Sequence, residues 1–169
     1  GSRNALNGAV DEGDEHARGP SLSHNVNMFF VQLGEFGRLG IEYWVLTAPE
    51  KTNKVPIAAF VNPKRPIILT LNGQNQAEMS QTIVRRHAEL PYLVQRVICH
   101  LDCNSLTRSA LRSLFVSTRE DARRSAVFKL IEQETIRVLQ SDDELKRLNT
   151  EAKESLRHEQ DETAVEQMR

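Results

Sequence analysis

The stretch IILTLNGQNQ, residues 67–76, decides how the middle of the chain is organised. Its first half, IILTL, is a short continuous apolar run, which is typical of a strand covered on both faces. Asn72-Gly73 follows directly and is a strong turn dipeptide. Helical spacing of apolar residues comes next, over 76–88, and residues 94–103, VQRVICHLDC, return to strand composition. These features predict a strand–turn–helix–strand unit over about residues 66–103.

Three further strands are expected on the N-terminal side of this unit, over 25–36, 41–48 and 55–61. On its C-terminal side, residues 104–115 predict a short helix and residues 119–140 a longer one. The sequence therefore predicts an α+β domain with a mixed sheet of about five strands, helices packed on one face and a helical C-terminal extension.

Composition divides the chain into three parts. Residues 1–22 are rich in Gly, Asn and acids without a sustained period, which predicts a disordered lead-in. Residues 23–140 form the expected domain. Residues 141–169 begin with SDDE, a second capping box, and lose their apolar residues after Leu156, which predicts a packed helix that ends as a solvated or frayed tail.

The charge distribution favours an anionic partner for the middle of the chain. Residues 51–140 carry 14 basic and 7 acidic residues, whereas residues 1–50 carry 3 basic and 7 acidic and residues 141–169 carry 5 basic and 9 acidic. A plainer interpretation is that acidic ends balance a basic body for solubility. Phosphate-loop, dinucleotide, zinc-protease and nucleophile-elbow motifs are absent, so a self-contained active site is not expected.

The only cysteines, Cys99 and Cys103, lie four residues apart. A structural zinc site needs four ligands, usually from two such pairs, and no second pair exists. We therefore expect no metal site and interpret both cysteines as small buried apolar residues on the face of Leu101. Free cysteines favour a reducing, cytoplasmic location. No stretch approaches the roughly 20 apolar residues of a membrane span.

The basic residues carry the functional prediction. Arg119 falls in the first turn of an expected helix, where exposed backbone N–H groups disfavour a cation. Two capping boxes fit this start, Ser117 with Glu120 and Thr118 with Asp121. Arg119 and Arg123 are one turn apart, so their guanidinium groups can converge on a phosphate at the helix start. Pairing of Arg119 with the neighbouring acids is the alternative.

The succession of RVICHLDC, SLTRSALRSLF, VSTRED and SDDEL resembles the middle domain of GHKL-type ATPases, most closely that of the ninety-kilodalton heat-shock chaperones. In that family a Ser-Arg-Glu element presents its arginine to the γ-phosphate of ATP held by a separate N-terminal domain. Here a threonine intervenes, giving Ser117-Thr118-Arg119-Glu120. The resemblance covers roughly residues 66–145 and is specific at residue level only at 117–120.

The resemblance implies a transducer domain that is not catalytic alone and acts with ATP and Mg bound by an N-terminal ATPase domain of the same protein. Arg119 would be the catalytic residue, acting in trans. Ser117, Thr118, Arg123 and Lys64 would be cofactor-binding candidates. The turn residues Asn72, Gly73 and Gln74 would lie where the neighbouring domain docks, and the nucleotide state would pass to a client or partner protein.

Two functions of other classes stay open. One is a nucleic-acid-binding module that uses the basic helices between Arg85 and Arg124, although aromatic residues are only 5% of the chain. The other is a plain interaction domain whose basic face meets an acidic protein.

Overall fold

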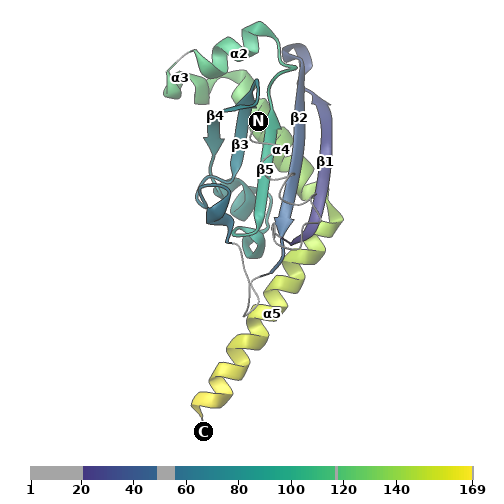
Figure 1. Cartoon of the computed structure of the whole chain (residues 1–169), viewed down its shortest axis with the longest axis vertical. Helices are drawn as coiled ribbons and strands as arrows, with labels where there is room; N and C mark the ends of the chain where they lie inside the picture. Colours follow the sequence, from purple (N-terminus) through teal and green to yellow (C-terminus); the bar gives the residue numbers. More distant parts are fainter. Residues whose placement is uncertain (1–20, 49–55, 117, 169) are drawn as a thin grey trace, which may run out of the picture.

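A mixed five-stranded sheet forms the centre of the domain (Figure 1). The computed structural model describes residues 21–48, 56–116 and 118–168. The strands are β1 (Leu22–Gln32), β2 (Arg38–Leu46), β3 (Ile67–Leu71), β4 (Gln74–Met79) and β5 (Val97–Asp102). Their order is β1-β2-β5-β3-β4, with β3 and β5 parallel and the other neighbours antiparallel. The predicted α+β class is confirmed.

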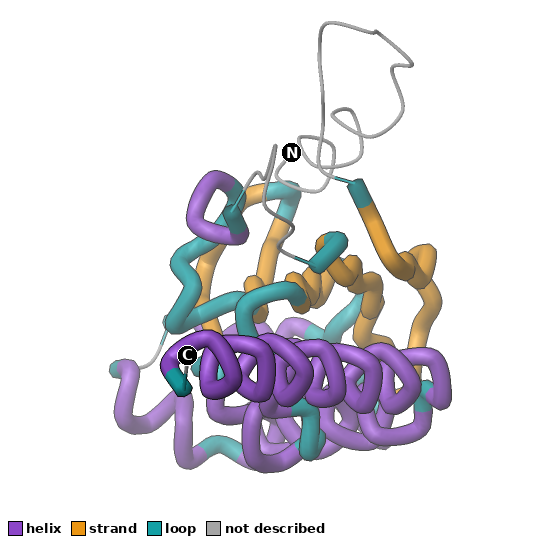
Figure 2. The backbone as a smooth tube through the Cα atoms, turned by 90° about the horizontal axis from the view of Figure 1, so that it is seen from below, coloured by secondary structure: helices purple, strands orange, loops and turns teal. Residues whose placement is uncertain are grey.

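The long helices lie on one side of this sheet (Figure 2). The helices are α2 (Arg108–Phe115), α3 (Arg119–Arg124), α4 (Ala126–Ser141) and α5 (Asp143–Gln167). Short helical segments are η1 (Gly34–Phe36), η2 (Ile57–Ala59), η3 (Ile83–His87) and η4 (Pro91–Leu93). Figure 1 shows α2 and α3 at one end of the sheet, while α5 leaves at the other.

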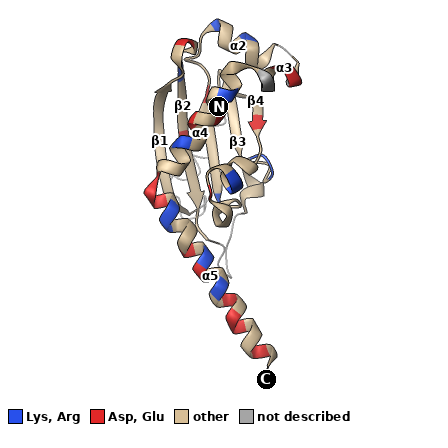
Figure 3. Ribbon diagram, turned by 180° about the vertical axis from the view of Figure 1, so that it is seen from behind, with Lys and Arg blue, Asp and Glu red and all other residues tan. Residues whose placement is uncertain are grey.

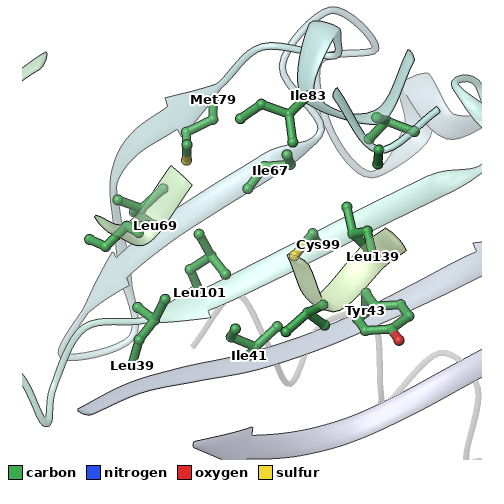
Figure 4. Close-up of a cluster of buried hydrophobic side chains, with 14 of the residues drawn as sticks. Leu39, Ile41, Tyr43, Ile67, Leu69, Met79, Ile83, Cys99, Leu101 and Leu139 are labelled. Carbon is green, nitrogen blue, oxygen red and sulfur yellow. The ribbon is translucent and has the colours of Figure 1, made fainter. Parts of the chain in front are cut away.

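The core lies between the sheet and the helices because alternate strand residues point to this side. Ile41 of β2 and Leu69 of β3 both pair with Leu101 of β5, and all three side chains are fully buried. Figure 4 shows this cluster, in which Cys99 lies beside Leu139 of α4. A smaller apolar cluster, formed by Trp44, Leu46, Ile57 and Ile98, covers part of the opposite face.

One strand is not the expected segment. The strand predicted over 55–61 is wrong, since residues 57–59 form η2. Pro56 precedes this turn, and only Ile57 of its three residues is buried, so the segment contributes one anchor to the smaller cluster instead of an alternating strand.

The fifth strand is β4, a polar edge strand. Asn72 (φ 52°) and Gly73 (φ 78°) make a two-residue hairpin turn, which returns the chain along β3. The prediction of a helix over 76–88 is therefore wrong for Gln76–Met79, which belong to β4. The helical element in this stretch is η3, a π-helix formed by Ile83–His87. A strand on the sheet edge keeps one row of backbone groups toward solvent, so its polar side chains are tolerated there.

The predicted long helix is broken in two. Ser125 has extended backbone (ψ 149°), ends α3 and caps α4 by accepting from the Phe128 N–H at 3.2 Å. Its hydroxyl also donates to the Ala122 carbonyl at 2.7 Å. This local hydrogen bonding competes with continued helix, as Ser side chains commonly do.

Asp142 joins the start of α5 to the sheet. Its Oδ1 caps the helix by accepting from the Glu144 N–H at 2.9 Å, so Asp142 takes the cap position expected for Ser141. Its Oδ2 accepts from the Tyr43 hydroxyl of β2 at 2.5 Å and lies 2.9 Å from His24 Nε2 of β1. The N-terminal part of α5 packs through Leu145 and Leu148, and the side chains of α5 are exposed from Lys153 onward.

Candidate functional site

Three connections meet at the end of the sheet where α2 begins, which we call the α2 end. The Asn72 N–H donates to Asn104 Oδ1 at 2.7 Å, tying the β3–β4 turn to the loop after β5. Gly37 bridges to Leu106 in the same loop, where an added Cβ would lie 2.5 Å from the Ser105 carbonyl oxygen. Gly37 also has φ 94°, so only glycine fits this approach without strain.

The start of α3 belongs to the same end of the molecule (Figure 1). Thr118 is its cap: Thr118 Oγ1 accepts from the Asp121 N–H at 3.2 Å and donates to Asp121 Oδ2 at 2.8 Å. The predicted pairing of Thr118 with Asp121 is therefore confirmed. Arg119 is the first residue of α3, as expected, but this helix has six residues instead of running to residue 140.

Several predicted phosphate-binding groups lie outside the described part of the structure. These are Ser117 and the side chains of Arg119 and Arg123. A phosphate contact by Arg119 thus stays a prediction. The described residues place the backbone of Arg119 directly after the cap, with Glu120 and Asp121 in the same first turn.

The docking candidates Asn72, Gly73 and Gln74 lie at the α2 end, as the turn and first residue of β4. Asn72 and Gly73 both have left-handed backbone, which fixes the direction of the turn. Gln74 is exposed. The structure therefore brings this turn and the start of α3 to one end of the sheet.

Lys64 does not belong to that group. It lies in the turn before β3, and β3 runs from there toward the α2 end, so the five residues Ile67–Leu71 separate Lys64 from Asn72. A strand rises about 3.3 Å per residue, which puts roughly 16 Å between the two turns. The Lys64 carbonyl instead accepts from the Gln81 N–H at 2.8 Å, beside η3. The grouping of Lys64 with Arg119 is corrected accordingly.

A buried hydrogen-bonded line that the sequence did not predict crosses the sheet face opposite the helices. His100 Nδ1 lies 2.8 Å from Glu42 Oε1, and His100 Nε2 lies 2.6 Å from Thr70 Oγ1. The residues come from the neighbouring strands β2, β5 and β3: Glu42 is paired with His100 in the register, and Thr70 lies two residues beyond Ile68, the partner of His100 on β3. The order hydroxyl–imidazole–carboxylate is the one that activates a nucleophile.

The exposed fraction of Thr70 decides against that chemistry. Only 2% of Thr70, 6% of His100 and 4% of Glu42 are exposed, so the hydroxyl does not reach an external substrate. We interpret the line as structural, since buried polar groups that are fully paired specify how strands align. The sequence signal was one polar residue in the middle of each apolar strand.

The two cysteines are buried and free, as predicted. Burial raises the pKa of the Cys103 thiol to about 12 and raises that of Cys99 further, so both stay protonated. The described residues contain no group of three or more His, Cys, Asp or Glu side chains placed to hold a metal ion. None of the described helices combines the length and the apolar character needed to cross a membrane.

Comparisons with family models, curated proteins and solved structures gave no match to this chain.

Proposed function

We propose that this domain is the transducer module of a larger GHKL-type ATPase and is not catalytic alone. ATP and Mg would be held by a separate ATPase domain, and Arg119 would neutralise charge on the transferred phosphoryl group, as arginine fingers do. The proposal starts from the resemblance at Ser117–Glu120 and from the α+β fold of the domain.

One observation carries it. The β3–β4 turn and the capped start of α3, which are far apart in sequence, lie at the same end of the sheet. A second domain that docks on Asn72–Gln74 would therefore also face the segment that contains Arg119. The turn is tied to the loop before α2, so a change in docking there can be passed to the helices.

The test is ATP turnover by the protein in its full-length form. Arg119→Ala is expected to lower turnover at least about tenfold, because arginine fingers contribute larger factors than this. Arg119→Lys should not restore the rate, since an ammonium cannot reproduce the guanidinium fork. Arg112→Ala, at an exposed position of α2, is the matched control and should leave turnover unchanged. An unaltered rate in Arg119→Ala, with the fold intact by circular dichroism, would remove the proposal.

The nucleic-acid hypothesis needs one continuous basic surface, but the four of its arginines whose side chains the structure describes lie in two separate places. Arg85 and Arg86 belong to η3, which follows β4 at the end of the sheet away from Asn72, whereas Arg108 and Arg112 are on α2. This separation disfavours a single surface that runs from Arg85 to Arg124.

A further inference from the structure

Four basic residues from two separate segments gather at the end of the sheet opposite the α2 end. Lys64 and Arg65 come from the turn before β3, and Arg85 and Arg86 come from the π-helix η3. The Gln81 N–H donates to the Lys64 carbonyl at 2.8 Å, and the Arg85 N–H donates to the Gln81 carbonyl at 2.9 Å. We call these four residues the basic cluster; Figure 3 shows its blue segments beneath the end of β4.

The backbone under the basic cluster is firmly held. Ile83 and Val84 are buried in the core, so the next residues of η3 point outward. The His87 carbonyl accepts from Gln140 Nε2 of α4 at 2.6 Å. In the other segment, Asn62 Oδ1 accepts from the Lys64 N–H at 3.0 Å. A π-helix is rare and is found frequently at functional sites.

The cations of the basic cluster are exposed and make no ion pair with any described residue. Glu78 and Glu89 are the acids of the same part of the chain. Glu78 Oε1 is occupied by the Asn75 side chain at 3.0 Å, and neither acid forms a salt bridge within the described chain. Within residues 21–48, 56–116 and 118–168, therefore, no acidic side chain neutralises the positive charge of the basic cluster.

We propose that the basic cluster binds the phosphate backbone of double-stranded DNA. Protein interfaces concentrate binding energy in Trp, Tyr and Arg anchors set in well-packed, desolvated surroundings; the cluster has arginines, but neither of its segments supplies an exposed large apolar side chain to surround them. DNA interfaces are polar and positively charged. The cluster also lacks the aromatic rings that single strands stack on. The cluster offers only cationic donors, which suit phosphates, whereas recognition of duplex RNA adds shape and 2′-hydroxyl contacts across the minor groove.

The test is fluorescence anisotropy of a labelled random-sequence DNA duplex titrated with the 169-residue chain. Four phosphate contacts predict a slope of about −3.6 for log K against log salt, or roughly a 100-fold loss of affinity between 50 and 200 mM salt. Lys64→Ala with Arg65→Ala, and separately Arg85→Ala with Arg86→Ala, should halve that slope to about −1.8. Arg108→Ala with Arg112→Ala, at two exposed positions of α2, is the matched control and should bind as the unmodified chain does.

The proposal fails if the unmodified chain does not bind DNA at 50 mM salt, or if the α2 variant loses as much affinity as the cluster variants. Equal or tighter binding of polyglutamate would assign the cluster to an acidic protein instead, and tighter binding of duplex RNA would overturn the choice of DNA. The substituted side chains are exposed, so circular dichroism should show an intact fold. Arg119→Ala should not affect DNA binding, which keeps this test separate from that of the ATPase proposal.

Discussion

Replacing Asp142 by alanine should strongly destabilise the domain, because this carboxylate caps α5 and also accepts the hydrogen bond of the buried Tyr43 hydroxyl. Loss of a helix cap costs about 1 kcal/mol. The Tyr43 hydroxyl would also lose its acceptor while the tyrosine stays 3% exposed, and an unpaired buried hydroxyl costs about 1–3 kcal/mol. Together these losses predict that the free energy of unfolding falls by about 2–4 kcal/mol.

Urea denaturation followed by circular dichroism measures this change. Asp143→Ala is the matched control, since the side chain of Asp143 is 95% exposed and its loss should change the free energy of unfolding by less than about 0.5 kcal/mol. Asp142→Asn should fall between the two, because asparagine caps helices well but places an amide group near Tyr43 and His24. Equal stability of the Asp142→Ala and Asp143→Ala variants would refute the reasoning.

The same carboxylate predicts a pH dependence. Burial raises the pKa of Asp142, but the hydrogen bonds from Tyr43 and His24 outweigh it, so the pKa lies below its ordinary value. Asp142 therefore contributes stability that is complete above the unfolded pKa of about 3.9 and is lost as the pH falls through the lower folded value. Acid titration of the unmodified chain should show this loss, and the Asp142→Asn variant should lack that component.

Three other substitutions test the local geometry. Gly73→Val should cost about 1–2 kcal/mol in thermal unfolding, because a β-branched residue is strained at φ 78°; an unchanged melting temperature would argue against the hairpin. Ser125→Ala should lower stability by about 1 kcal/mol through loss of the α4 cap, which urea titration against the unmodified chain can detect. His100→Leu should cost about 1–3 kcal/mol by leaving Glu42 and Thr70 without their shared partner; Glu42→Gln, which keeps a hydrogen-bonding group at the position, should cost less.

The sequence predicted the strands whose own residues carry the signal. Residues 41–46 of β2 are all buried, and Ile67, Leu69 and Thr70 of the IILTL run of β3 are buried as well; both segments were expected as strands. Cys99 and Leu101 of β5 lie on the same face of the strand and belong to the main core, as predicted. These strands lie inside the sheet, where burial on both faces imposes an apolar composition.

The elements that the sequence did not predict, β4 and the break between α3 and α4, depend on features that the apolar pattern does not record. Four of the six residues of β4 are polar, since the strand lies at an edge, and Met79 is its one buried residue, so the composition of β4 does not distinguish it from a helix or loop. The break at Ser125 depends on one hydroxyl that bonds to the backbone on both sides of it. Hydrogen bonds of one side chain do not change the spacing of apolar residues in the flanking helices, so the sequence pattern does not reveal this break.

In the candidate sites, too, contacts within one segment were predicted and contacts between distant segments were not. The capping pair Thr118 and Asp121 is local and was predicted. The backbones of Lys64 and Arg85 are both hydrogen-bonded to Gln81, which requires the β3–β4 hairpin to fold back, and that hairpin was not predicted past its turn. The contacts of Glu42, His100 and Thr70 require the strand order, which no single segment reveals.

The attachment of α5 has a mechanical consequence. A helix of 25 residues, with a rise of 1.5 Å per residue, is about 37 Å long. Because its base is fixed to β1 and β2 and its outer half stands clear in solvent, a tilt of about 10° at the base would swing the tip by about 6 Å. A small tilt at the base of α5 would thus become a larger displacement of its end, and a pair of fluorophores on β1 and near Val165 would register such a tilt as a change in energy transfer.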